Sequence, residues 1–344
     1  MKSLKGTLLG FAKDLSGFIL LILFLILFFN IDSFKNEQVG ITVPDTWLLI
    51  HMNFLSIVLE AVPFILLGVF VSALIQIYVK EEIIHRYLPK NAYAALLPAA
   101  IMGAIFPICE CAIVPIVRRL IKKGMPLHVG VVFLVAAPIL NPIVAASTFF
   151  AFRTDLSVLY ARMGLAFILS ILIGAILYII FKNKDQLRWT KDELVGRQVV
   201  VDPIYPRKMN RIKQTMYHAA DEFFLMGKYL IMGAFVASLF QTLLDREFLL
   251  AIGTNEWSST AVMMGFAFLI SLCSEADAFV AASFNNTFST GSLVAFLVYG
   301  PMLDLKNTFM LFAFFKVRFV VTFMTVVTVV VFAAMIALQY LQIL

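Results

Sequence analysis

Long apolar runs separated by short polar stretches dominate the chain. A transmembrane helix needs about 20 mainly apolar residues, and most of these runs reach that length. The pattern predicts an all-α polytopic protein, a multi-pass protein of the cell membrane, with about seven full spans. The runs interpreted as full spans are residues 15–31, 47–79, 127–152, 156–181, 222–244, 290–316 and 319–341.

The placement of charged residues orients these spans. Cytoplasmic loops carry an excess of Lys and Arg, and the polar segment 182–221 holds nine of them. Lys2, Lys5 and Lys13 precede the first run, and no small-residue cleavage site follows it. We therefore expect a retained helix with a cytoplasmic N-terminus rather than a signal peptide.

Composition excludes most other classes of protein. Hydrophobic residues make up 62% of the 344 residues and charged residues 14%, against about 25% charged in soluble domains. A soluble domain and a disordered chain are both excluded by this balance. The net charge of +6 sits in the loops, so the lipid bilayer, and no nucleic acid, is the expected partner. The sequence contains no Walker A, GxSxG or HExxH motif, and it predicts neither an enzyme nor a cofactor.

Two shorter apolar segments predict re-entrant hairpins, which enter the membrane and return to the same side. The segment 90–122 starts and ends beside Lys and Arg but is too short for two spans, which places its tip at Pro107–Cys111. The segment 258–285 stops at Cys273–Asp277 and enters from the opposite side. Irregular backbone at membrane depth is tolerated only where it is buried in protein or lines a cavity.

The two halves of the chain resemble each other. Leu67–Gln76 and Met232–Gln241 share five of ten positions, and Phe133–Asn141 and Phe296–Asp304 share five of nine. Because the predicted orientations of the copies are opposite, the pattern predicts an inverted repeat with two opposed re-entrant helical hairpins, as in many secondary transporters. The predicted organisation is an N-terminal helix and outer loop (1–46), a first repeat (47–181), a cytoplasmic basic linker (182–221) and a second repeat (222–344).

Three cysteines mark the predicted hairpin tips. Cys109 and Cys111 face the same way only in an extended or unwound segment, and Pro107 and Pro115 favour unwinding here. Cys273 on the opposing tip would supply a third thiol. Three sulfurs suit a trivalent metalloid or a thiophilic metal, so these residues are candidate soft-ion ligands without a defined metal site. The simpler interpretation is that the cysteines only pack.

Carboxylates at membrane depth predict a polar pathway. Each costs about 2.5–3.5 kcal/mol or more unless it is paired or hydrated. The alternative is structural pairing, for example of Asp304 with Lys306. The candidates for proton coupling are Glu60, Glu110, Glu275 and Asp277. The candidates for substrate binding are Cys109, Glu110, Cys111, Asn141, Cys273, Glu275, Asp277 and Asp304.

Prolines interrupt the helices at matching places in the two halves. Asn141 and Asp304 occupy the same repeat position, three residues after Pro138 and Pro301. A proline frees a carbonyl one turn earlier, so both helices would line one cavity unless the prolines only kink them for packing. The predicted helix-breaking residues are Pro107, Pro138, Pro142 and Pro301.

Four segments carry a family resemblance: FPICECAIVPIVRRLIKKGMP and VAAPILNPIV in the first half, and SLCSEADAF and YGPMLD in the second. With them, the chain from about residue 47 onward resembles the predicted-permease family that includes the ArsP organoarsenical efflux permeases. The resemblance implies a multi-spanning permease, and some family members export trivalent methylated or aromatic arsenicals. The chain is also similar to a Gram-positive branch thought to act as one subunit of a two-component permease, which implies a second membrane subunit.

These observations predict a secondary transporter for a small thiophilic, metalloid or metal-related solute. Its site would lie at the bilayer midplane, at the two hairpin tips, and proton coupling would use the buried carboxylates. Three alternatives stay open: a permease for another small anion with structural cysteines, a membrane subunit that holds a partner, and an intramembrane thiol enzyme. A homo-oligomer is a further option.

Overall fold

The computed structural model describes residues 45–78, 89, 91–182, 184, 186–188, 211–243, 256–285 and 287–341. The chain divides into two compact units, Met1–Asn53 and Phe54–Leu344, and the packing described below lies within the second. The predicted first span, residues 15–31, lies outside the described residues.

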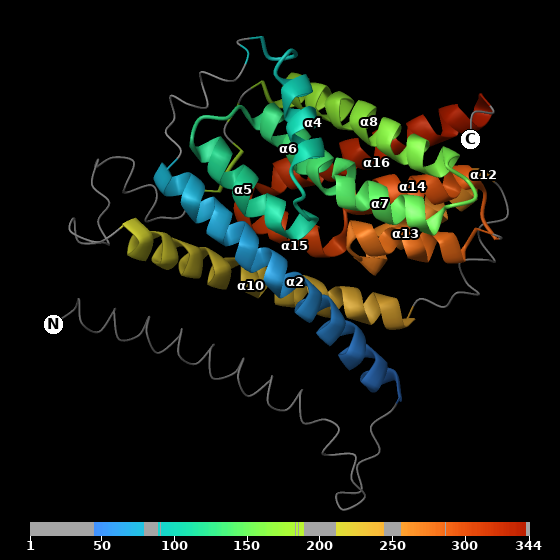
Figure 1. The fold of residues 1–344 in the computed structure, drawn as a ribbon, viewed down its shortest axis with the longest axis horizontal. Coiled ribbons are helices and arrows are strands. Elements are labelled where there is room, and N and C mark those ends of the chain that lie inside the picture. Colours follow the sequence, from blue (N-terminus) through green and yellow to red (C-terminus); the bar gives the residue numbers. More distant parts are fainter. Residues whose placement is uncertain are drawn as a thin grey trace, which may run out of the picture. The chain divides into compact units, whose positions relative to one another are not determined.

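Helices account for nearly all of the described residues (Figure 1). The only β-type pairing in this part of the chain is an isolated antiparallel bridge between Leu187 and Phe315. The helices before the basic segment are α2 (Asp45–Tyr78), α4 (Leu96–Ile105), α5 (Glu110–Lys122), α6 (Leu127–Leu140), α7 (Pro142–Ala151) and α8 (Ser157–Phe181). Those after it are α10 (Arg211–Leu243), α12 (Glu256–Ile270), α13 (Ser274–Ser283), α14 (Thr290–Met302), α15 (Leu305–Phe314) and α16 (Val317–Tyr340).

Within the described residues, five helices are long and apolar enough to cross a membrane: Thr46–Tyr78, Leu127–Ala151, Ser157–Phe181, Thr215–Leu243 and Val317–Tyr340. They correspond to five of the seven predicted spans, and the stretch Leu127–Ala151 comprises α6 and α7. The predicted span 290–316 is likewise two helices, α14 and α15, separated at Leu303 and Asp304, close to the break predicted after Pro301. The helical, multi-pass character predicted from the sequence is therefore confirmed, whereas the opposed orientation of the halves stays a prediction.

Two of the four predicted helix-breaking prolines, Pro107 and Pro142, lie at helix interruptions, whereas Pro138 and Pro301 lie inside α6 and α14 and do not end these helices. The residue before a proline disfavours the helical conformation, and Phe106 before Pro107 is extended (φ −86°, ψ 117°). Asn141 before Pro142 is extended as well (φ −67°, ψ 151°). In the second half, the interruption between α12 and α13 contains no proline. There Ser271 has a left-handed φ of 48°, which ends the helical conformation.

The first predicted hairpin tip differs from its prediction in one respect. Cys109 has extended backbone and caps α5, but Glu110 and Cys111 already belong to the first turn of that helix, and Pro115 lies inside it. The prediction of an unwound segment containing both cysteines is therefore wrong. An acidic residue in a first turn complements the helix dipole, which favours a start at Glu110.

The helix α10 begins at Arg211 rather than at residue 222. The apolar pattern predicted only the part of this helix that is apolar enough to lie in the membrane, and it missed the polar turns before residue 222. Residues 211–221 contain neither Gly nor Pro, so nothing in their propensities ends the helix at the edge of the apolar run.

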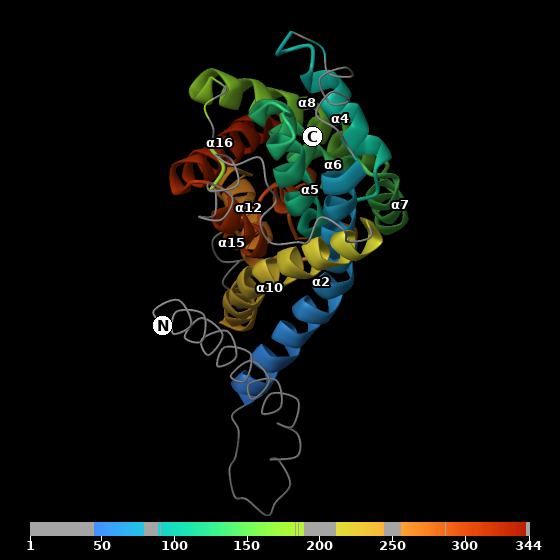
Figure 2. The same ribbon diagram turned by 90° about the vertical axis from the view of Figure 1, so that its left-hand side faces the viewer.

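Helices from the two halves of the chain interlock. The helix α13 packs beside α7, and α15 packs against both α5 and α10 (Figure 1). Figure 2 shows α4, α6 and α7 to the right of α12, α15 and α16. Gly68 on α2 permits a close approach, because a Cβ there would lie 2.6 Å from the Cα of Ala112 on α5. This packing brings the helix interruptions of both halves into the interior.

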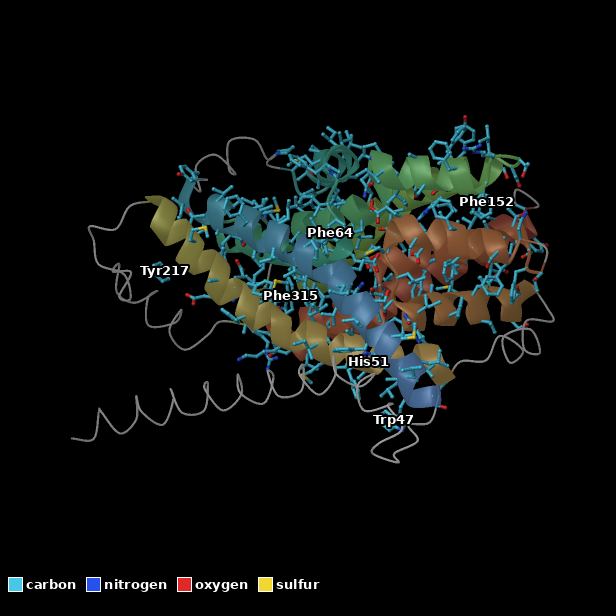
Figure 3. The ribbon with its side chains drawn as sticks, turned by 60° about the horizontal axis from the view of Figure 1, so that its bottom comes forward. Trp47, His51, Phe64, Phe152, Tyr217 and Phe315 are labelled. Atoms are coloured by element: carbon cyan, nitrogen blue, oxygen red, sulfur yellow. The ribbon has the colours of Figure 1, made fainter. Side chains whose placement is uncertain are left out.

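Large apolar side chains cover the outer surfaces of the long helices. Phe64 projects from α2 and Tyr217 from α10 (Figure 3), and they are 42% and 45% exposed. Such exposure is costly in water but natural in lipid, because lipid tails are as apolar as these side chains.

Candidate functional site

Lys306 lies buried among charged groups. It is the second residue of α15 and is 2% exposed. Its Nζ donates to Glu110 Oε1 at 3.0 Å and to the Ser271 carbonyl oxygen at 3.2 Å, and it lies 3.7 Å from Asp304 Oδ2. These oxygens come from three different helix interruptions, which Lys306 joins at one point. We refer to Glu110, Asp304 and Lys306 as the central cluster.

The three cysteines gather around the central cluster. Cys109, Cys111 and Cys273 are all buried free thiols. Lys306 interacts electrostatically with each of them, and Cys111 interacts with both other thiols. The structure therefore brings the cysteines of both predicted tips to one place. No three Cys, His, Asp or Glu side chains of the described residues are arranged as a metal-binding group.

A second charged cluster lies beside the first. Arg162 on α8 is fully buried, donating from Nη1 to Thr148 Oγ1 at 2.7 Å and from Nη2 to the Ser274 carbonyl oxygen at 3.0 Å. It also interacts electrostatically with Asp277 and Glu275. We refer to Thr148, Arg162, Ser274 and Asp277 as the Arg162 cluster. Asp277 interacts electrostatically with both Asp304 and Lys306 of the central cluster, so the two clusters adjoin.

The half-helices α5, α7, α13 and α15 all begin at these interruptions, and two of them are capped by their own side chains. Asn141 Oδ1 accepts from the backbone N–H of Val144 at 2.9 Å, and Asp304 Oδ1 accepts from the backbone N–H of Asn307. These caps satisfy amide groups that the first turn of a helix leaves unpaired. Asn141 and Asp304, which the sequence matched as repeat positions, thus have the same local role.

Several buried oxygen atoms of these clusters have no hydrogen-bond partner among the described residues: Glu110 Oε2, Ser274 Oγ, Asp277 Oδ2, Asp304 Oδ2 and Asn307 Oδ1. One buried donor atom, Arg162 Nε, also has no hydrogen-bond partner among the described residues. Buried polar atoms are usually paired with protein or water. These atoms therefore mark the place where a solute, a proton or water would bind.

The other predicted site residues lie close by or shape the interruptions. Glu60 is half-buried on α2 and interacts electrostatically with Cys273. Pro138 and Pro301 lie inside α6 and α14. Pro142 is the first residue of α7, and Pro107 lies in the interruption before α5.

A third polar cluster joins α2, α5 and α10, and we refer to it as the Glu222 cluster. Glu222 on α10 accepts from Ser72 at 2.7 Å and pairs with Arg119 at 3.3 Å and Arg118 at 3.6 Å. Arg119 also donates to Gln76 Oε1 at 2.8 Å. Basic residues are common at the cytoplasmic ends of membrane helices, but that position alone leaves this buried pairing with the second half of the chain unexplained.

The sequence indicated no role for Arg162 or Glu222, and it indicated Lys306 only as a structural partner of Asp304. Arg162 and Lys306 did carry a signal, because each is a basic residue inside a predicted span, where charged residues are costly and usually functional. The two arginines that pair with Glu222 stand where the positive-inside rule expects basic residues, so their positions indicated no buried partner.

A helical, multi-pass membrane protein with charged residues buried at helix interruptions has the architecture of a permease. The chain belongs to a predicted permease family, which matches residues 47–340. It is 49% identical over 292 residues to the UPF0718 protein YcgR of Bacillus subtilis, and the aligned region covers 85% of this chain and 97% of that protein. It is also 40% identical over 275 residues to a Streptococcus mutans protein named as a putative two-component membrane permease complex subunit. That aligned region covers 78% of this chain and 88% of that protein. No solved structure matches.

Proposed function

We propose that the chain is a secondary transporter whose solute binds at the central cluster near the middle of the membrane. The observation that carries this proposal is the burial of Lys306 between Glu110 of the first half and Asp304 of the second. Charged side chains inside membrane helices are costly, and they usually mark solute or ion pathways. Membership of a permease family supports transport rather than catalysis.

An inverted repeat is part of the proposal. The order α2, α4, α5, α6, α7, α8 is matched by α10, α12, α13, α14, α15, α16. In both series the second and third helices are separated by a segment that ends at a cysteine, and the fourth and fifth by a polar cap. This correspondence supports two re-entrant hairpins, α4–α5 and α12–α13, that enter from opposite sides.

The proposed solute is small and thiophilic, such as a trivalent metalloid species or a soft metal. The three thiols around the central cluster support this choice, because sulfur ligands favour soft ions. In this proposal Cys109, Cys111 and Cys273 bind the solute, and Asn141 and Glu275 shape the cavity around it.

Proton coupling is proposed for the buried carboxylates. Glu110 and Asp304 flank a single ammonium group, so the central cluster carries one excess negative charge when all three groups are ionised. One bound proton neutralises it, and the cost of an unbalanced charge in a medium of low dielectric favours that exchange. Asp277 and Glu60 are proposed as further carriers along the same pathway.

A second membrane subunit is proposed as the partner of this chain. The support is the Streptococcus mutans relative, which is named as a subunit of a two-component permease complex. A homo-oligomer is the alternative assembly, and co-purification of the tagged full-length chain from its native membrane distinguishes the two.

Thiol labelling tests the proposed site. Variants that retain one or two of Cys109, Cys111 and Cys273 are labelled with a membrane-impermeant thiol reagent from each side, with and without a trivalent arsenical. We expect slow labelling of all three cysteines and protection by the arsenical of variants that retain at least two thiols. Rapid labelling from the outside without protection would contradict both the midplane site and the thiophilic solute.

A further inference from the structure

We propose that the central cluster binds its solute as a cation or electropositive centre, and that the ammonium group of Lys306 holds the place of that cation until the solute displaces it. This inference rests on the proposed function and specifies the charge of the solute and the role of Lys306. It excludes the anionic solute that the sequence left open.

The atoms available to a ligand at this place are almost all acceptors. Among the described residues, the buried oxygens without hydrogen-bond partners include three carboxylate oxygens, on Glu110, Asp277 and Asp304, and the amide oxygen of Asn307. Carboxylate and amide oxygens only accept hydrogen bonds or bind cations. Ser274 Oγ can act either way, and it too is fully buried. A ligand that binds to these unpaired acceptor oxygens must supply hydrogen-bond donors or positive charge.

The donors that an anion would need are either engaged or flanked by carboxylates. The Nζ of Lys306 contacts Glu110, Asp304 and the Ser271 carbonyl oxygen. Arg162 donates from Nη1 to Thr148 and from Nη2 to Ser274, and Nε is its one nitrogen without a partner among the described residues. Helix N-termini often bind anions, but α7 and α15 are capped by Asn141 and Asp304. The N-termini of α5 and α13 have no side-chain cap, and their first turns carry the carboxylates of Glu110, Glu275 and Asp277, which repel an anion. An anion would meet carboxylates here before it met a free donor.

Lys306 occupies the position that suits an entering cation. Its ammonium lies 3.0 Å from Glu110 Oε1 and 3.7 Å from Asp304 Oδ2. Cys109 and Cys111 flank Glu110 in the chain, and Cys273 follows Ser271, whose carbonyl oxygen also accepts from Lys306, by two residues. A second positive charge at this point would be repelled by the ammonium, whose attraction to the carboxylates is strong at low dielectric. Solute and Lys306 therefore compete for the same oxygens, and removal of the ammonium relieves that competition.

Binding of Cd²⁺ to the purified full-length protein in detergent, measured by calorimetry, tests this competition. We expect Lys306→Met to bind Cd²⁺ at least tenfold more tightly than the unmodified chain. The matched control is Lys316→Met, which removes an exposed lysine beyond the end of the same helix and leaves the affinity unchanged. Unchanged or weaker binding by Lys306→Met would overturn the inference.

Two further measurements keep the test decisive. If Lys306→Met does not fold, Lys306→Gln replaces it, because an amide can still donate a hydrogen bond to Glu110 but carries no positive charge, and we expect this variant to bind Cd²⁺ more tightly than the unmodified chain. Unchanged or weaker binding there would show that Lys306 is only structural and would overturn the inference. Binding of inorganic phosphate that Lys306→Met abolishes would assign an anionic solute instead.

The labelling experiment separates this inference from the proposed function. If the arsenical protects the thiols but Lys306→Met gains no affinity for Cd²⁺, the transport site stands and the role of Lys306 is wrong. If the thiols are not protected and Glu110→Gln changes no transport, the proposed function fails first.

Discussion

Lys306 and Glu110 form an ion pair of 3.0 Å between residues 196 positions apart in the chain. Lys306 lies in the first turn of α15 and Glu110 in the first turn of α5, so the ion pair connects the two helix interruptions at which these helices begin. Both side chains are at most 2% exposed. A pair that is so deeply buried has consequences for stability that can be measured separately from transport.

Removal of one partner of this pair should destabilise the protein strongly. A buried charge that loses its partner typically costs about 3–5 kcal/mol, so Glu110→Ala should lower the thermal unfolding temperature of the detergent-solubilised protein. The double variant Glu110→Gln/Lys306→Met removes both charges and should recover most of the loss. If the destabilisation of the double variant equalled the sum of the Glu110→Gln and Lys306→Met effects, the two side chains would contribute independently.

Arg162 should be required for transport through its two hydrogen bonds rather than through its charge alone. It connects Thr148 on α7 with the Ser274 carbonyl at the start of α13. Arg162→Lys keeps the charge but cannot make the forked contact, so we expect a transport loss of about tenfold or more with normal membrane insertion. Arg188→Lys, at an exposed hydrogen bond to the Phe312 carbonyl oxygen outside the clusters, is the control. Full activity of Arg162→Lys would contradict this role.

The fold could be predicted further than the site, and the residues show why. Apolar run length and proline position located the long helices and the interruptions at Asn141 and Phe106, because both effects act locally along the chain. The sequence paired Lys306 with Asp304, two residues away, and the structure has this pair. The other partners of Lys306 and Arg162 could not be assigned, because Glu110 and Ser274 are distant in sequence. The CxC motif misled for a different reason: its spacing favoured an extended tip, whereas the helix begins between the two cysteines.

The Glu222 cluster should restrict access to the central cluster from the predicted cytoplasmic side. Glu222→Gln weakens the pairing with Arg118 and Arg119 that holds α5 against α10. We expect Cys109 and Cys111 to label several-fold faster from the cytoplasmic side in this variant. Labelling of Cys273 from the outside serves as the internal control and should not accelerate. Unchanged labelling of all three cysteines would mean that this cluster only anchors the helices.

The crossing of α2 and α5 should tolerate no side chain at Gly68. A Cβ at this position would lie 2.6 Å from the Cα of Ala112 and 2.8 Å from its carbonyl oxygen. Both neighbours are backbone atoms, so relief requires the helices to move apart, and overpacking of this kind typically costs about 1–3 kcal/mol. Gly164→Ala on α8 is the matched control, because no atom lies within 4 Å of the added Cβ there. We expect Gly68→Ala, but not Gly164→Ala, to lower the unfolding temperature and to reduce transport, since Ala112 directly follows the two site residues Glu110 and Cys111. Equal effects of the two substitutions would contradict the close approach of these helices.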